Sequence, residues 1–239
     1  MDNQQGNSHI SLEQFFEPVA YTIGALLGDG SVKCYTYITG EKRVMEYKVV
    51  IANMDKECVE RVCGEINRFC DANYRVAEYE NPHKTTMYRL AINNTPIYEF
   101  FHYFIGEKLF LADEVFRVGR EAQLDFLAGL FDTDGTIAES SGYWRIGYAA
   151  RTRTLVEDVA RLLQKLGVKV GKIYEQVSGY GTTMYIIKPN IRSFVDAGCY
   201  FYIQRKVDRL YRYLNTVNRH NYMKPSETIM PDPRLRVMI

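Results

Sequence analysis

Polar and apolar positions along the chain predict one series of elements that occurs twice. Residues 21–32 read YTIGALLGDGSV, an apolar run that ends in Asp-Gly and predicts a buried helix. Alternating positions from 32 to 52 predict two strands joined by a turn at Gly40 and Glu41. The first half continues with a helix, a hairpin and a second helix, predicted over 56–70, 74–92 and 97–104.

The same order returns in the second half. Residues 126–137 read FLAGLFDTDGTI and align with the opening run on their final Asp-Gly. The alignment matches three pairs of positions: Gly24 with Gly129, Gly28 with Thr133, and Asp29 with Asp134. The tetrapeptide TTMY also occurs in both halves, at 85–88 and 182–185. Two landmarks in the same order indicate an internal duplication.

The second half repeats the predicted elements and adds one helix. A hairpin turns at Ser141 and Gly142, and Thr154 and Glu157 fit a capping box at the start of a helix that stops at Gly167. The remaining elements are a hairpin, a short helix, a final helix and an extended tail, predicted over 170–189, 191–197, 203–218 and from Lys224. We therefore predict an α+β protein of two pseudo-symmetric αββαββα units, with the halves at 1–118 and 119–239.

Glycines four residues apart predict close packing between the two apolar helices. Gly24 and Gly28 each cost about 1 kcal/mol relative to alanine in a helix interior, and close approach of two backbones would offset that cost. Such packing would bring Asp29 and Asp134 side by side at the helix ends. Neighbouring carboxylates repel each other unless they share cations, and their oxygens suit Mg²⁺. Two such ions about 4 Å apart are a known arrangement for phosphodiester cleavage.

Composition narrows the function only a little. The formal net charge is +1, so bulk charge does not indicate a polyanionic partner. The five cysteines form no CxxC pair, which disfavours a zinc site or a disulfide framework and favours a reducing compartment. No run approaches the roughly 20 apolar residues that span a bilayer. We expect a soluble intracellular protein without a membrane partner, in the cytoplasm of a prokaryote or in an organelle.

The two apolar runs carry a family resemblance. TIGALLGDG and LAGLFDTDG resemble the two signature motifs of the LAGLIDADG homing endonucleases, and the order of predicted elements is similar over nearly the whole chain. The resemblance implies a single-chain, monomeric nuclease with a saddle-shaped antiparallel sheet in each half, packed through the two LAGLIDADG helices. It also implies that Asp29 and Asp134 bind two or more Mg²⁺ ions, assisted by the carbonyls of Gly28 and Thr133.

Members of this family usually place a basic residue just after the second strand of each half. Arg151 occupies that position in the second half, whereas Met54, beside Asn53, occupies it in the first. The resemblance therefore makes Asn53 and Arg151 candidate catalytic residues. It also predicts that the two half-sites are chemically unequal.

The predicted hairpins have the dimensions of a DNA reader. A two-stranded ribbon fits the major groove, which is about 12 Å wide, so four hairpins could contact roughly 20 bp of double-stranded DNA. The candidate DNA-binding residues are Lys33, Tyr35, Tyr37, Lys42, Arg43, Lys48, Arg75, Lys84, Arg89, Arg145, Lys172, Gln176 and Lys188. The resemblance implies a site-specific, intron-encoded endonuclease that breaks both strands of a long asymmetric target. Two alternatives stay open: an RNA-splicing maturase that holds intron RNA, and a DNA-binding regulator that has lost cleavage.

Overall fold

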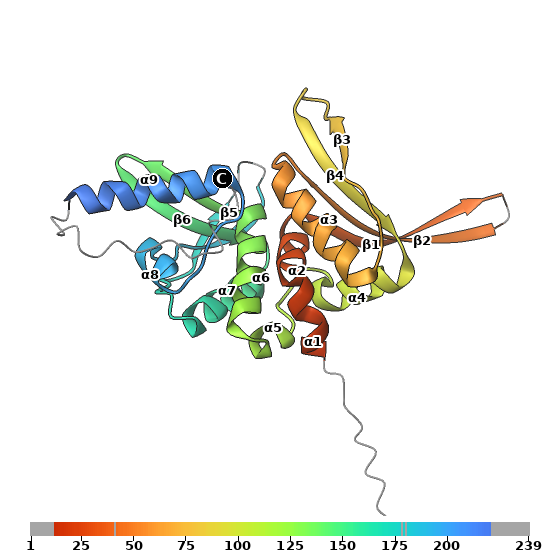
Figure 1. Cartoon of the computed structure of the whole chain (residues 1–239), viewed down its shortest axis with the longest axis horizontal. Coiled ribbons are helices and arrows are strands. Elements are labelled where there is room, and N and C mark those ends of the chain that lie inside the picture. The colour runs from red at the N-terminus through yellow and green to blue at the C-terminus, as the bar shows by residue number, and fades with distance from the viewer. Residues whose placement is uncertain (1–11, 41, 178, 180, 221–239) are drawn as a thin grey trace, which may run out of the picture.

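A computed structural model describes residues 12–40, 42–177, 179 and 181–220, which form two α+β units side by side (Figure 1). Helix α2 (Ala20–Gly28) of the first unit and helix α6 (Arg120–Thr133) of the second lie together at the centre of the molecule. The predicted fold class is confirmed. The predicted tail from Lys224, and Glu41 of the first predicted turn, lie outside the described residues.

The first unit is a four-stranded antiparallel sheet with helices on one face. Its strands lie in the order β1-β2-β4-β3. They are β1 (Gly30–Thr39), β2 (Lys42–Asn53), β3 (Ala77–Glu80) and β4 (Thr86–Asn93). The helices are α1 (Leu12–Phe16), the 3₁₀ helix η1 (Glu17–Val19), α2, α3 (Lys56–Cys70) and α4 (Thr95–Ile105). A short helix, α5 (Glu114–Arg117), leads into the second unit.

The second unit repeats this topology. Its strands lie in the order β5-β6-β8-β7. They are β5 (Gly135–Ser140), β6 (Tyr143–Ala150), β7 (Tyr174–Val177) and β8 (Thr183–Ile187). The helices after α6 are α7 (Arg153–Lys165), α8 (Ile191–Asp196) and the final helix α9 (Gln204–His220). None of the described helices is long and apolar enough to cross a membrane.

Strand register establishes which residues of the two units are equivalent. Asn53, the last residue of β2, lies opposite Tyr88 in the first TTMY copy. Ala150, the last residue of β6, lies opposite Tyr185 in the second copy. In the structure Asn53 therefore corresponds to Ala150, and the residues that follow, Met54 and Arg151, correspond to each other.

Alternation along the strands separates a buried face from an outer face. In the first sheet Val32, Val49 and Ile51 are buried in the core beneath the helices. Lys33, next to Val32, points to the outer face and is exposed. Successive side chains of a strand point to opposite sides of a sheet, so one face of each sheet packs on the core and the other faces solvent.

Helices α2 and α6 pack through their glycines, as the sequence predicts. A Cβ atom at Gly24 would lie 1.9 Å from the Phe126 carbonyl oxygen, and one at Gly129 would lie 2.1 Å from the Tyr21 carbonyl oxygen. Real Cβ atoms do not approach so closely, so only glycine fits at either position. The helix backbones therefore touch each other directly.

Several local predictions differ from the structure, among them the second hairpin of the second half, whose strand β7 begins at Tyr174 rather than at 170. Helix α7 begins at Arg153 rather than at Thr154, and Glu157 forms an ion pair with Arg153 at 2.8 Å, so the predicted capping box is wrong. Strand β3 begins later than predicted, because the Asn67 side chain of α3 bonds both the N–H and the C=O of Tyr74. These groups are then satisfied without strand pairing. The short helices α1, η1 and α5 were not predicted, since they are too short to show a period.

Candidate functional site

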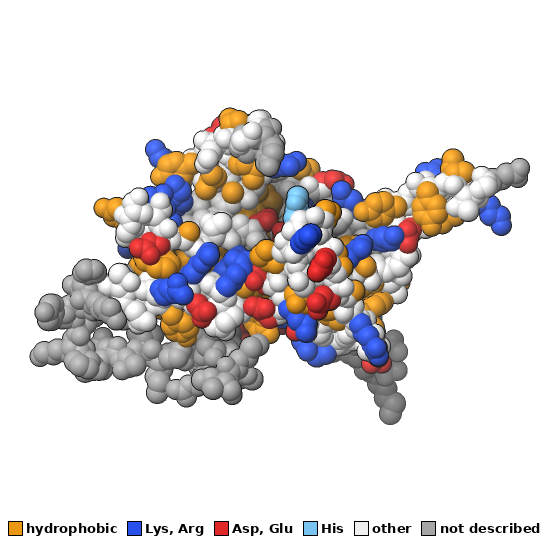
Figure 2. All heavy atoms as spheres, turned by 90° about the horizontal axis from the view of Figure 1, so that it is seen from above, with side chains coloured by type: hydrophobic (Ala, Val, Ile, Leu, Met, Phe, Trp, Pro, Cys, Tyr) orange, Lys and Arg blue, Asp and Glu red, His pale blue; other side chains and the backbone are white. Residues whose placement is uncertain are grey.

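Two carboxylates meet where the central helices end. Asp29 follows α2 and Asp134 follows α6, and each donates its backbone N–H to its own helix, at 3.1 Å and 3.0 Å. Both helices end on the same face of the molecule, which Figure 2 shows from above. A Cβ atom at Gly28 would lie 3.3 Å from the carboxyl carbon of Asp134. The close packing of the helices thus places the second carboxylate against the end of the first helix.

Burial and mutual repulsion act on both carboxyl groups. Burial raises the pKa of Asp134 to about 6, and the negative charge of Asp29 adds to the rise. Burial also raises the pKa of Asp29, although a hydrogen bond from Asn53 opposes the rise. The positive charges of Lys108 and Lys206 favour the ionised form of both groups. The site therefore holds two carboxylates that a nearby cation would stabilise.

Asn53 is oriented so that its amide nitrogen contacts Asp29. The Nδ2 atom donates to a carboxylate oxygen of Asp29 at 2.7 Å, and the Oδ1 atom accepts from the Asp55 backbone N–H at 2.8 Å. Because an N–H can only donate, the Asp55 contact fixes which end of the Asn53 amide faces Asp29. The equivalent residue of the second half is Ala150, which has no donor for Asp134.

Lys108 caps the end of α2 and was missed by sequence reasoning. Its Nζ atom donates to the carbonyl oxygens of Gly28 at 2.5 Å and Gly30 at 2.7 Å. Its backbone has a φ of 57°, a left-handed conformation that costs a residue with a side chain about 1 kcal/mol or more. Burial lowers the pKa of Lys108, and the charges of Asp134 and Asp29 oppose that shift.

Lys206 caps the end of α6 as Lys108 caps the end of α2. Its Nζ atom donates to the carbonyl oxygens of Phe131, Asp132 and Gly135 at 2.6–2.7 Å, and the residue is 3% exposed. Burial lowers its pKa to about 8. Lys108 follows α4, and Lys206 lies in the first turn of α9 after α8, the helix of the second unit that corresponds to α4. That shared place in the duplication was the available signal.

The Asp132 carboxylate binds the backbone of the segment that directly precedes Lys206. Its buried carboxylate accepts from the hydroxyl of Tyr21 on α2 at 2.9 Å and from the backbone N–H of Tyr202 at 2.9 Å. Burial raises its pKa to about 6. Asp132 therefore ties the two central helices together and anchors the start of α9.

Arg151 and Met54 occupy equivalent positions in the two halves, and both lie at the surface. Both side chains are exposed, Met54 by 54%. Within the described residues, neither makes a hydrogen bond or ion pair with Asp29 or Asp134. The structure thus brings Asn53, Lys108 and Lys206 to the carboxylates, while a role for Arg151 stays a prediction.

Four candidate DNA-binding residues of the first half lie together on the outer face of its sheet. Lys33, Tyr35 and Tyr37 of β1 lie there with Lys48 of β2, and all but Lys48 are exposed. Lys48 is half-buried and pairs with Glu46 at 2.7 Å. The others are exposed: Lys42 and Arg43 at the hairpin end, Arg75, Lys84 and Arg89. Arg43 pairs with Ile38 in the register, so it points to the opposite side of the hairpin from Tyr37.

The second sheet carries a smaller group on the corresponding face. Lys172 and Lys188 both lie near the Tyr174 ring, with Nζ atoms 5.5 Å and 4.8 Å from its centre. Gln176 on the same strand β7 and Arg145 on β6 are also exposed. Figure 2 shows Lys and Arg side chains spread over both halves, with acidic side chains between them.

The two aspartates alone offer too few ligands for a divalent cation, so a bound cation would need further oxygen ligands. Among the described residues, no group of three His, Cys, Asp or Glu side chains surrounds a common point. The two aspartates could hold divalent cations only with backbone carbonyls, water or a bound phosphate as further oxygen ligands. Of the predicted ligands, the Gly28 carbonyl already accepts from Lys108 and retains one lone pair.

Comparison with known proteins finds a family model that resembles the second half of the chain. The model of a LAGLIDADG-like domain matches residues 121–224. No curated protein sequence matches the chain.

Several solved structures are similar over most of the chain. Mesophilic variants of the homing endonuclease I-DmoI are 19% identical, with 77% of this chain and 93% of that chain covered and a TM-score of 0.56. I-DmoI in complex with DNA and Mn is 20% identical, with 76% and 94% covered and a TM-score of 0.57. The meganuclease I-SmaMI bound to uncleaveable DNA is 10% identical, with 87% and 94% covered and a TM-score of 0.55. Residues 121–224 therefore form a LAGLIDADG-like domain, and the chain as a whole has the two-unit fold of the LAGLIDADG homing endonucleases.

Proposed function

We propose that this chain is a site-specific endonuclease that cuts both strands of double-stranded DNA with the help of Mg²⁺, acting as a monomer on a target of roughly 20 bp. The observation that carries the proposal is the meeting of Asp29 and Asp134 at the ends of two helices whose backbones touch. Solved structures with this fold are complexes with DNA and with Mn, Ca or Mg, which supports both parts of the proposal.

Asp29 and Asp134 would hold the divalent cations, with the carbonyl oxygens of Gly28 and Thr133 as further ligands. A bound divalent cation supplies positive charge beside the scissile phosphate. Lys108 and Lys206 add fixed positive charge beside the same carboxylates, and Asn53 orients the carboxylate of Asp29. Fixed charges in a partly buried site stabilise charge that develops during phosphodiester cleavage.

The outer faces of the two sheets would follow the DNA on either side of this centre. The exposed lysines and arginines suit phosphate oxygens and guanine edges. Tyr35, Tyr37 and Tyr174 add flat apolar surface among them. The two outer faces carry different side chains at equivalent positions, so an asymmetric target is expected.

Selection from a randomised DNA library tests this function without knowledge of the natural site. The protein would first capture 30-bp duplexes in Ca²⁺, and the captured pool would then be exposed to Mg²⁺ or to EDTA. We expect one family of sequences to be captured and cut in both strands only with Mg²⁺. Asp134→Asn should capture the same sequences without cutting them.

Specific capture without cutting by the wild-type protein would favour the DNA-binding regulator. Absence of any sequence-specific capture, together with retention of structured RNA in a parallel selection, would favour the maturase. Cutting by wild type and by Asp134→Asn at the same rate would show that the carboxylate pair is not the active centre.

A further inference from the structure

The first turn of helix α9 is part of the second unit, but it forms an ion pair and a hydrogen bond with the first unit. Arg205 contacts the Asp55 carboxylate from two nitrogens, with Nε at 2.7 Å and 2.9 Å from its oxygens and Nη2 at 2.6 Å. The neighbouring backbone N–H of Gln204 donates to Glu57 at 3.1 Å. Asp55 and Glu57 lie at the start of α3, so the C-terminal helix is fastened to the beginning of a helix in the other half.

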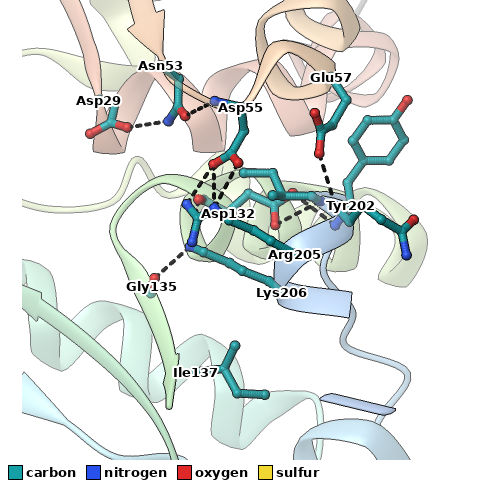
Figure 3. A network of polar contacts seen from close by, with 12 residues as sticks. Asp29, Asn53, Asp55, Glu57, Asp132, Gly135, Ile137, Tyr202, Arg205 and Lys206 are labelled. Carbon is teal, nitrogen blue, oxygen red and sulfur yellow. Dashed lines mark hydrogen bonds and ion pairs between the residues drawn. The ribbon is translucent and has the colours of Figure 1, made fainter. Parts of the chain in front are cut away.

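Asp55 links these contacts of α9 to Asp29. Its side chain makes no capping bond to α3, although it directly precedes that helix, and its carboxylate accepts from Arg205 instead. Its backbone N–H donates to Asn53, which in turn donates to Asp29 (Figure 3). The contacts form one continuous series from Arg205 through Asp55 and Asn53 to Asp29.

Within the part of the second half that the structure describes, there is no equivalent series. Ala150 stands in the place of Asn53, and Thr152 precedes α7 in the place of Asp55. Neither Ala150 nor Thr152 has a charged side chain with which an arginine could form an ion pair. The two carboxylates, which look alike in sequence, therefore differ in how their surroundings hold them.

We propose that Arg205 is a positioning residue for Asp29, acting through Asp55 and Asn53, so that one of the two half-sites depends on the C-terminal helix. The inference rests on the proposed function where it concerns cutting. The Asp55 side chain is 11% exposed. Loss of Arg205 would therefore leave a nearly buried carboxylate without its partner, and such a loss disturbs its neighbours more than loss of a surface ion pair does.

The series can be tested without DNA. The side-chain amide of Asn53 gives a nitrogen-15 NMR signal that Asn53→Ala identifies by its disappearance. We expect Arg205→Ala to shift this signal and to speed its exchange with solvent. The matched control is Arg192→Ala, which removes another arginine–aspartate pair, with Asp196 at 3.0 Å, from the same half. An Asn53 signal that is unchanged in Arg205→Ala would overturn the inference.

Cutting gives the second test. Each strand of a duplex selected with the wild-type protein would be labelled separately, and the rates of cutting compared. We expect Arg205→Ala and Asn53→Ala to slow the same strand by about tenfold relative to the other, the size typical of lost support around a metal ligand. The double variant should be no slower than Asn53→Ala alone, because both changes act on one series. Arg192→Ala should leave the strand ratio unchanged.

The outcomes separate the two proposals. A wild-type protein that cuts neither strand would contradict the proposed function, while the NMR test of Arg205 still stands. Equal slowing of both strands, or independent effects of the two variants, would overturn the inference and leave the function intact. Arg205→Lys keeps the charge but not the two-nitrogen contact, so it should fold and give an intermediate ratio even if Arg205→Ala is too unstable to measure.

Discussion

The glycine contact between α2 and α6 permits a quantitative prediction for Gly129→Ala. The new Cβ atom would lie 2.1 Å from the Tyr21 carbonyl oxygen and 2.8 Å from the Ala25 backbone nitrogen. Ordinary contact begins near 3.4 Å, so the helices would have to separate by about 1.3 Å at this point. Both obstacles are backbone atoms, which cannot rotate away as a side chain would. We expect a loss of about 3 kcal/mol in the free energy of unfolding, at the upper end of overpacking costs.

A matched glycine elsewhere isolates this effect. Gly64 lies in α3, and a Cβ atom there would meet only the end of the Arg68 side chain, at 3.5 Å. Gly64→Ala should therefore stabilise the protein by up to about 1 kcal/mol, through helix propensity alone. Urea unfolding followed by circular dichroism measures both variants. A Gly129→Ala variant within 0.5 kcal/mol of wild type, or as stable as Gly64→Ala, would refute direct backbone packing.

Other perturbations address the carboxylates, the buried lysine and the unequal halves. Because the pKa of Asp134 is raised to about 6, the folded protein binds more protons than the unfolded chain between about pH 4 and 6, and stability falls as pH rises through that window. Asp134→Asn should therefore raise the melting temperature without metal at pH 7.5 but not at pH 4, and should abolish the further rise that Mg²⁺ gives the wild type. Lys206→Met should cost about 2–4 kcal/mol in urea unfolding, because three carbonyls lose their donor; a cost below 1 kcal/mol would contradict the cap. When the two DNA strands are labelled separately, Met54→Lys should narrow the difference between their cutting rates, and Arg151→Ala should slow one DNA strand more than the other. If neither variant changes the rates, both residues lie outside the site.

Local patterns were enough to predict the architecture of the protein. Apolar runs, alternating strands and the repeated Asp-Gly depend on neighbours in the chain, and the duplication let each half support the assignment of the other. The glycines predicted the helix contact for the same reason, since a glycine that costs free energy in a helix indicates that something lies close to it. From that contact the proximity of Asp29 and Asp134 follows directly.

The surroundings of the carboxylates depended on the tertiary structure. Lys108 lies in a connection with no periodic pattern, and Lys206 is one of several basic residues on an amphipathic helix. Nothing local distinguishes either from a solvated lysine, because each acquires its role from carbonyls that end a helix many residues away. The pairing of Arg205 with Asp55 joins residues 150 apart in the sequence. The sequence already predicts unequal half-sites from Met54 and Arg151. The packed chain shows that the Asn53 amide contacts Asp29, whereas its equivalent Ala150 has no amide, and that Arg205 of α9 crosses from the second unit to pair with Asp55 beside Asn53.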